Sequence, residues 1–79
     1  MSPSTLQRRL AESGATLAAM VREVRLEIAL GLLQTTELPI GEIALRCGWQ
    51  SHSRFSANFQ ERWGVAPSVV KARTQLEAN

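Results

Sequence analysis

The chain has 79 residues, of which 44% are hydrophobic and 20% are charged, and nine Lys and Arg residues against seven Glu residues give a net charge of +2. This length and composition predict one small folded domain and exclude both a multidomain enzyme and a disordered chain. The sequence contains no Asp, one His and one Cys, which excludes a Ser-His-Asp triad and a zinc site built from several Cys and His residues. We therefore expect no catalysis, no metal and no cofactor.

The single cysteine and the distribution of charge indicate where the protein works. Cys47 has no partner for an intramolecular disulfide, and the N-terminus lacks the pattern of a secretion signal, so we expect a cytoplasmic protein. The longest apolar stretch, residues 17–33, is interrupted by charged residues, which excludes a membrane-spanning helix. The slight positive charge permits an anionic partner without requiring one.

Five helices and no strand are predicted from the spacing of apolar residues and of Gly and Pro. The first covers about residues 3–12, with Ser2 as its cap and Leu6 and Leu10 on its inward face, and Gly14 is expected to end it. The second covers about residues 16–34. It carries two apolar stripes, Met20, Val24 and Ile28 on one and Leu26, Ala29, Leu30 and Leu33 on the other, so we expect it to be buried on most sides between two bodies of structure.

The remaining helices are predicted at about 39–47, at about 52–63, and from Pro67 onward. The third turns Ile40, Ile43, Ala44 and Cys47 inward, and the fourth turns Phe55, Phe59 and Trp63 inward. Gly48 and the three residues after it form a short turn between these two helices, which is the arrangement of a helix-turn-helix. Plain helical hairpins also use Gly in their turns, so this feature alone leaves DNA binding and a helical bundle equally open.

The outward face of the fourth helix favours DNA binding. Ser53, Ala57 and Gln60 lie opposite the two phenylalanines, with Arg54 beside them, and short polar side chains of this kind can enter a major groove. A surface helix without function remains the alternative. An internal similarity adds support, because Ser2, Leu6 and Leu10 repeat the pattern of Ser51, Phe55 and Phe59 at an offset of 49 residues.

The segments "MSPSTLQRRLAESG" and "LPIGEIALRCGWQSHSRFSANFQERWGVAPS" resemble the C-terminal DNA-binding domain of bacterial AraC/XylS-type transcription regulators, over about residues 1–73. The resemblance implies an all-α fold in which two helix-turn-helix units, the first incomplete, are joined by a long central helix. It assigns 1–14 to the remnant of the first unit, 15–35 to the linker helix, and 39–73 to the second unit with its terminal helix. It also implies an N-terminally truncated domain whose apolar surface is exposed unless a second copy covers it.

The resemblance implies a sequence-specific DNA-binding regulator that inserts its recognition helices into successive major-groove segments of double-stranded DNA. Base-reading positions carried over residue by residue are Ser4, Gln7, Arg8, His52, Ser53, Ser56 and Ala57. Ser51, which suits a helix cap, and Arg54 are expected to contact phosphates. Besides DNA, a second copy of the chain and the transcription machinery are candidate partners. The alternative function is a helical protein–protein interaction module that uses the exposed leucines.

Overall fold

The computed structural model describes residues 3–78, apart from the side chains of residues 3, 4, 6, 7, 10, 13 and 78. Its four helices are α1 (Pro3–Thr35), α2 (Ile40–Arg46), α3 (His52–Trp63) and α4 (Pro67–Ala78). The described part of the chain contains no strand, which confirms the predicted all-α class. None of its helices carries an apolar run long enough to cross a bilayer.

The prediction of two separate helices before residue 35 is wrong. Residues 3–35 form one continuous helix, and Gly14 lies inside it instead of ending it. Gly lowers helix stability by about 1 kcal/mol relative to Ala, which is too little to stop a helix that continues into the strong helix formers Ala15, Leu17, Ala18 and Ala19. Thr16, at the predicted start of the second helix, is likewise an internal residue of α1.

Gly64, which follows the predicted fourth helix, behaves differently from Gly14. Gly64 has a φ of +76° and ends α3, where its N–H donates to the Gln60 carbonyl. Pro67 follows three residues later, and a proline cannot continue a helix without losing a backbone hydrogen bond. The internal similarity between the two segments therefore does not extend to a helix end at Gly14, and the predicted cap Ser2 and the side chains of Leu6 and Leu10 lie outside the described residues.

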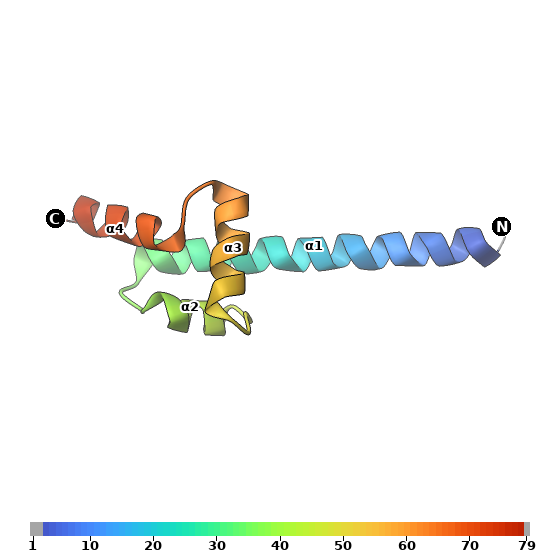
Figure 1. Cartoon of the computed structure of the whole chain (residues 1–79), viewed down its shortest axis with the longest axis horizontal. Helices are drawn as coiled ribbons and strands as arrows, with labels where there is room; N and C mark the ends of the chain where they lie inside the picture. The colour runs from blue at the N-terminus through green and yellow to red at the C-terminus, as the bar shows by residue number, and fades with distance from the viewer. Residues whose placement is uncertain (1–2, 79) are drawn as a thin grey trace.

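The three shorter helices all pack around the C-terminal half of α1 (Figure 1). In this view α2 and α4 lie on either side of α1, and α3 crosses it, while the N-terminal half of α1 extends away alone. The molecule is therefore elongated, with extents of 61 × 20 × 18 Å. The buried core comes from α1, α2 and α3 and consists of Leu26, Ala29, Leu33, Ile43, Ala44, Cys47, Phe55 and Phe59.

Only one of the two apolar stripes predicted for α1 is buried. Leu26, Ala29 and Leu33 lie in the core, with Leu30 packed against it. The opposite stripe is exposed, so the expectation that the helix is buried on most sides is wrong for the described residues. The reason is geometric: α2, α3 and α4 pack around the part of the helix that carries Leu26, Ala29 and Leu33, and they leave Met20, Val24 and Ile28 exposed.

Candidate nucleic-acid interface

The turn between α2 and α3 has the geometry of a Schellman motif, in which two backbone N–H groups close the end of a helix. The Gly48 N–H donates to the Leu45 carbonyl at 3.1 Å, and the Trp49 N–H donates to the Ala44 carbonyl at 2.9 Å. Gly48 has a φ of +86°, a conformation that suits glycine because it lacks a Cβ. This turn reverses the chain within a few residues and sets α3 against α2, as the predicted helix-turn-helix requires.

Ser51 caps α3 as expected from the sequence. Its Oγ accepts a hydrogen bond from the Arg54 backbone N–H at 3.0 Å. The side chain is exposed, and its own hydroxyl proton remains available to a further acceptor. No acidic residue lies in the first turn of α3, so the partial positive charge of the helix N-terminus is not offset there.

The inward face of α3 is fixed by a row of aromatic contacts. Phe55 and Phe59 are fully buried, and their ring centroids lie 5.7 Å apart. Trp49 packs against Phe55 with ring centroids 5.9 Å apart, and Trp63 packs against Phe59 at 4.8 Å, with both pairs of rings tilted. The predicted inward positions of Phe55, Phe59 and Trp63 are confirmed, and Trp49 and Trp63 are partly buried against the core. The rotation of α3 about its own axis is thereby determined.

Of the predicted base-reading residues of α3, Ser53 and Ala57 lie on the side opposite the phenylalanines, and His52 lies in the first turn of the helix. His52, Ser53 and Ala57 are exposed, and Ser56 is half-buried. Arg54 is exposed at the edge of this surface, where its backbone carbonyl accepts a hydrogen bond from Asn58 Nδ2 at 2.8 Å. The structure thus brings all six predicted contacts between residues 51 and 57 to one end of α3.

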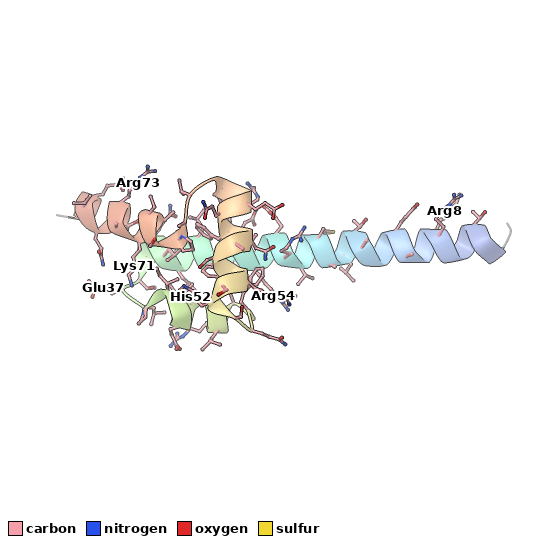
Figure 2. All side chains as sticks on the ribbon, viewed as in Figure 1. Arg8, Glu37, His52, Arg54, Lys71 and Arg73 are labelled. Carbon is pink, nitrogen blue, oxygen red and sulfur yellow. The ribbon has the colours of Figure 1, made fainter. Side chains whose placement is uncertain are left out.

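The predicted contacts near the N-terminus are not brought to this surface. Arg8 is exposed close to the far end of α1, well separated from His52 and Arg54 (Figure 2). The side chains of Ser4 and Gln7 lie outside the described residues. Since residues 3–14 continue directly into the rest of α1, they do not form an independently oriented helix. A base-reading role for Ser4, Gln7 and Arg8 stays a prediction.

Two basic residues close to α3 were missed by the sequence interpretation. Arg22 and Arg25 of α1 line the same depression as Arg54, together with Gly48, Trp49, Gln50 and Asn58. They come from the helix that the sequence identified only as a linker. The available signal was weak: two arginines three residues apart share one helix face, but nothing in the sequence indicated that this face lies beside the turn.

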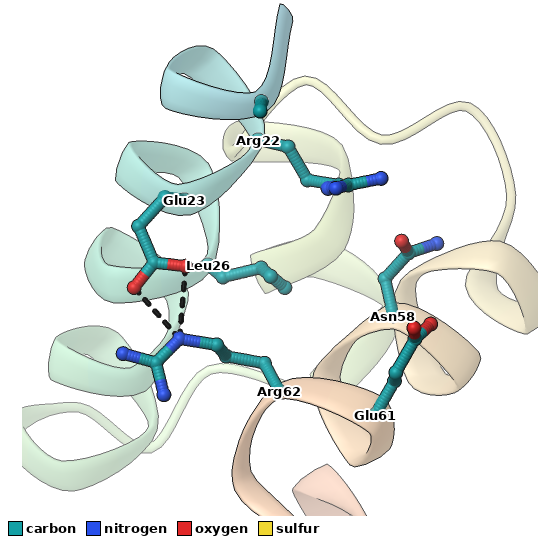
Figure 3. A pocket seen from close by; sticks show the side chains of 7 residues that line it. Arg22, Glu23, Leu26, Asn58, Glu61 and Arg62 are labelled. Carbon is teal, nitrogen blue, oxygen red and sulfur yellow. Dashed lines mark hydrogen bonds and ion pairs between the residues drawn. The ribbon is translucent and has the colours of Figure 1, made fainter. Parts of the chain in front are cut away.

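Other polar groups are engaged within the molecule. Arg62 Nε contacts both carboxylate oxygens of Glu23, at 2.7 and 2.9 Å, and so ties the C-terminal part of α3 to α1 (Figure 3). Lys71 Nζ donates to the Leu38 carbonyl at 2.9 Å and holds α4 against the loop after α1. Cys47 is buried, and burial raises the pKa of its thiol above the ordinary value of 9.0, which is consistent with the predicted core role. Among the described residues, no group of three His, Cys or Glu side chains could hold a metal ion.

Comparison with known proteins agrees with this geometry. The family model described as a helix-turn-helix domain matches residues 1–73. An uncharacterized HTH-type transcriptional regulator of Mycobacterium tuberculosis is 40% identical over 73 residues, which cover 92% of this chain and 21% of the relative. The HTH-type transcriptional regulator GadX of Escherichia coli is 32% identical over 77 residues, which cover 98% of this chain and 28% of the relative. No solved structure gives a significant match.

The ornithine utilization regulator of Pseudomonas aeruginosa is similar as well, with 39% identity over 67 residues that cover 85% of this chain and 20% of the relative. The fold and the exposed α3 surface define a helix-turn-helix domain. The chain belongs to the AraC-type helix-turn-helix family, whose members are DNA-binding transcription regulators and not enzymes. It spans between about a fifth and just over a quarter of the length of these relatives.

Proposed function

We propose that this chain binds double-stranded DNA by inserting the N-terminal half of α3 into the major groove, and that it regulates transcription in this way. The observation that carries the proposal is the exposed face of α3, where short side chains are held outward by the buried Phe55 and Phe59. A major groove admits an α-helix, and short polar side chains let the helix approach the base edges closely. Because bacterial DNA lies in the cytoplasm, this function also places the chain there.

Each predicted contact has a chemical role in this proposal. Ser53, Ser56 and His52 offer hydrogen bonds to base edges, and Ala57 offers an apolar contact to a thymine methyl group. Ser51 can donate its hydroxyl proton to a phosphate while its oxygen still caps the helix, and Arg54 supplies a charged phosphate contact. Since short side chains reach few base edges, we expect α3 to contribute a modest sequence preference.

The test is a matched pair of charge-introducing variants. Ala57→Glu places a carboxylate in the centre of the α3 face, whereas Ala72→Glu makes the same change on the exposed surface of α4. We expect Ala57→Glu to weaken binding to a random DNA duplex by at least about tenfold, because facing like charges cost several kcal/mol. Ala72→Glu should bind nearly as well as the unmodified chain. Fluorescence anisotropy at two salt concentrations measures both, and equal effects would contradict the assignment of α3.

A second function, self-association, is favoured by the exposed stripe of α1. Five large apolar side chains follow one another along three turns and are between 41% and 62% exposed: Leu17, Met20, Val21, Val24 and Ile28. Contiguous apolar surface of this kind is typical of an interaction site. We propose that a second copy of the chain covers this stripe. In a symmetric dimer the stripe of each copy packs against the stripe of the other, so apolar surface of both chains is removed from water.

Sedimentation equilibrium tests self-association directly. Val24→Glu lies in the middle of the stripe and should make the chain monomeric at concentrations where the unmodified chain forms dimers. Gln34→Glu, on an exposed position of the same helix, is the control and should leave the dimer intact. Association through apolar surface should also persist as salt rises, unlike DNA binding. A monomeric unmodified chain across the accessible concentration range would rule out this second function.

A further inference from the structure

Three arginines from distant parts of the sequence gather around one surface depression. Arg22 and Arg25 of α1 and Arg54 of α3 line it, together with residues 48–50 of the turn and Asn58. The depression has a volume of about 480 Å³ and lies where α1, the turn and the start of α3 meet. All three arginines are exposed, and Arg54 lies beside the junction of α3 with α1 (Figure 2).

None of these arginines takes part in an ion pair within the described part of the chain. The ion pairs found there join Arg46 to Glu42 and Arg62 to Glu23. The carboxylate of Glu23, which follows Arg22 directly, is therefore already neutralised by Arg62. Glu61, which has no ion pair among the described residues, lines the neighbouring depression together with Arg22 and Glu23 (Figure 3). The end of the depression formed by Arg25, Arg54 and the turn is lined by no carboxylate.

The turn holds Arg25 in place at this end. A Cβ atom on Gly48 would lie 3.2 Å from Arg25 Nε and 3.3 Å from its Cζ, so the guanidinium packs directly over the glycine. The positive φ of Gly48 favours a residue without a side chain, and a Cβ there would make the Arg25 guanidinium shift by a few tenths of an ångström. The turn between α2 and α3 therefore contacts Arg25 of α1 directly at Gly48.

The depression borders the surface that the proposed function assigns to DNA. Arg54 and Asn58 line it, and Ala57, which lies between them in sequence, belongs to the exposed face of α3. When a helix occupies a major groove, the two sugar-phosphate strands run along its two sides. One strand then passes the side of α3 that faces α1, where the three arginines lie. Guanidinium groups bind phosphate by charge and by paired hydrogen bonds.

We propose that Arg22, Arg25 and Arg54 form a binding site for DNA backbone phosphate, in which α1 contributes as much as α3. This inference rests on the proposed DNA-binding function and extends it, because Arg22 and Arg25 were not assigned any contact. The phosphate lies toward Arg25 and Arg54, away from Glu61. The mid-portion of α1 is thus part of the DNA surface as well as a support for the core.

The salt dependence of DNA binding provides the test. Each phosphate contact contributes about 0.9 to the slope of log affinity against log salt concentration. For the double variant Arg22→Gln with Arg25→Gln, we expect the magnitude of this slope to fall by about 0.9 for a random duplex, since one phosphate contact is lost, measured by fluorescence anisotropy at four or more salt concentrations. Arg73→Gln, an exposed arginine of α4 on the far side of the molecule, is the control and should leave the slope unchanged.

Two further measurements separate the loss of a phosphate contact from a loss of folding. Arg25→Lys retains the charge but not the planar fork, so it should retain the salt slope and lose only part of the affinity. Thermal unfolding followed by circular dichroism checks that each variant folds. If DNA binding by the unmodified chain depends steeply on salt and the folded double variant shows the same slope, the proposed phosphate site is wrong. The proposed DNA-binding function is not affected by that result. Salt-independent binding by the unmodified chain, or none, would overturn both.

Discussion

Gly48 shows how a single residue determines the position of the candidate site. Its positive φ allows the Schellman turn, and its missing side chain allows Arg25 to pack over the turn. The short spacing between Gly48 and Ser51 predicts the turn. It does not predict the contact with Arg25, because 23 residues separate the two and only the packing of α2 against α1 brings them together.

Substitution of Gly48 should therefore be costly in two ways. We expect Gly48→Ala to lower the free energy of unfolding by about 1–2 kcal/mol, because an L-residue is disfavoured at a φ of +86°. The added Cβ would also displace the Arg25 guanidinium. Gly31→Ala is the control: Gly31 is helical, nothing lies within 4 Å of its missing Cβ, and the change should stabilise the protein by up to about 1 kcal/mol. Urea unfolding of both variants measures the difference, and a loss from Gly31→Ala as large as that from Gly48→Ala would argue against a conformational cause.

At the scale of the helices, periodicity predicted α3 well and α1 poorly. The inward spacing of Phe55 and Phe59, the cap at Ser51 and the end near Gly64 all agree with the structure. In α1, the same method took Gly14 as an end, although a lone glycine among strong helix formers does not interrupt a helix. It also treated two apolar stripes as equivalent, because periodicity identifies apolar faces without showing which of them a neighbouring helix covers.

The orientation of α3 depends on its two buried phenylalanines. Phe59 is fully buried and packs against both Phe55 and Trp63, so Phe59→Ala leaves a large cavity at the centre of the core. We expect the free energy of unfolding to fall by about 3–5 kcal/mol, which is enough to unfold much of a domain this small. The adjacent Gln60→Ala, on the exposed face, should change stability by less than about 0.5 kcal/mol. Chemical denaturation of the two variants compares them, and similar losses would mean that the assigned faces of α3 are wrong.

For the molecule as a whole, the uneven distribution of packing along α1 is the dominant feature. Every described side chain between residues 8 and 22 is exposed, whereas the core begins at Leu26. The described side chains of this stretch add no buried packing to the backbone hydrogen bonds of the helix, and isolated helical segments of this length are marginally stable in water. The stability of this stretch should be lower than that of the core and should depend on whether another surface covers it.

Hydrogen exchange can measure this difference. In dilute solution, we expect the backbone amides of residues 8–18 to exchange much faster than those of the core segments 26–33 and 55–59, because local opening of the exposed helix requires no loss of core packing. Raising the protein concentration should slow exchange in residues 8–18 selectively if a second copy covers the apolar stripe. Uniform protection along α1 at high dilution would contradict this account of its stability.

The sequence by itself determined the features that depend on neighbouring residues. These are the all-α class, the turn at Gly48, the cap at Ser51, the inward face of α3 and the family to which the chain belongs. Tertiary structure alone decided which stripe of α1 is buried and that Arg22 and Arg25 lie beside Arg54. The physical reason is that helix formation and capping follow from local backbone hydrogen bonds and side-chain spacing. The proximity of distant segments follows instead from how the helices pack, which no local pattern specifies.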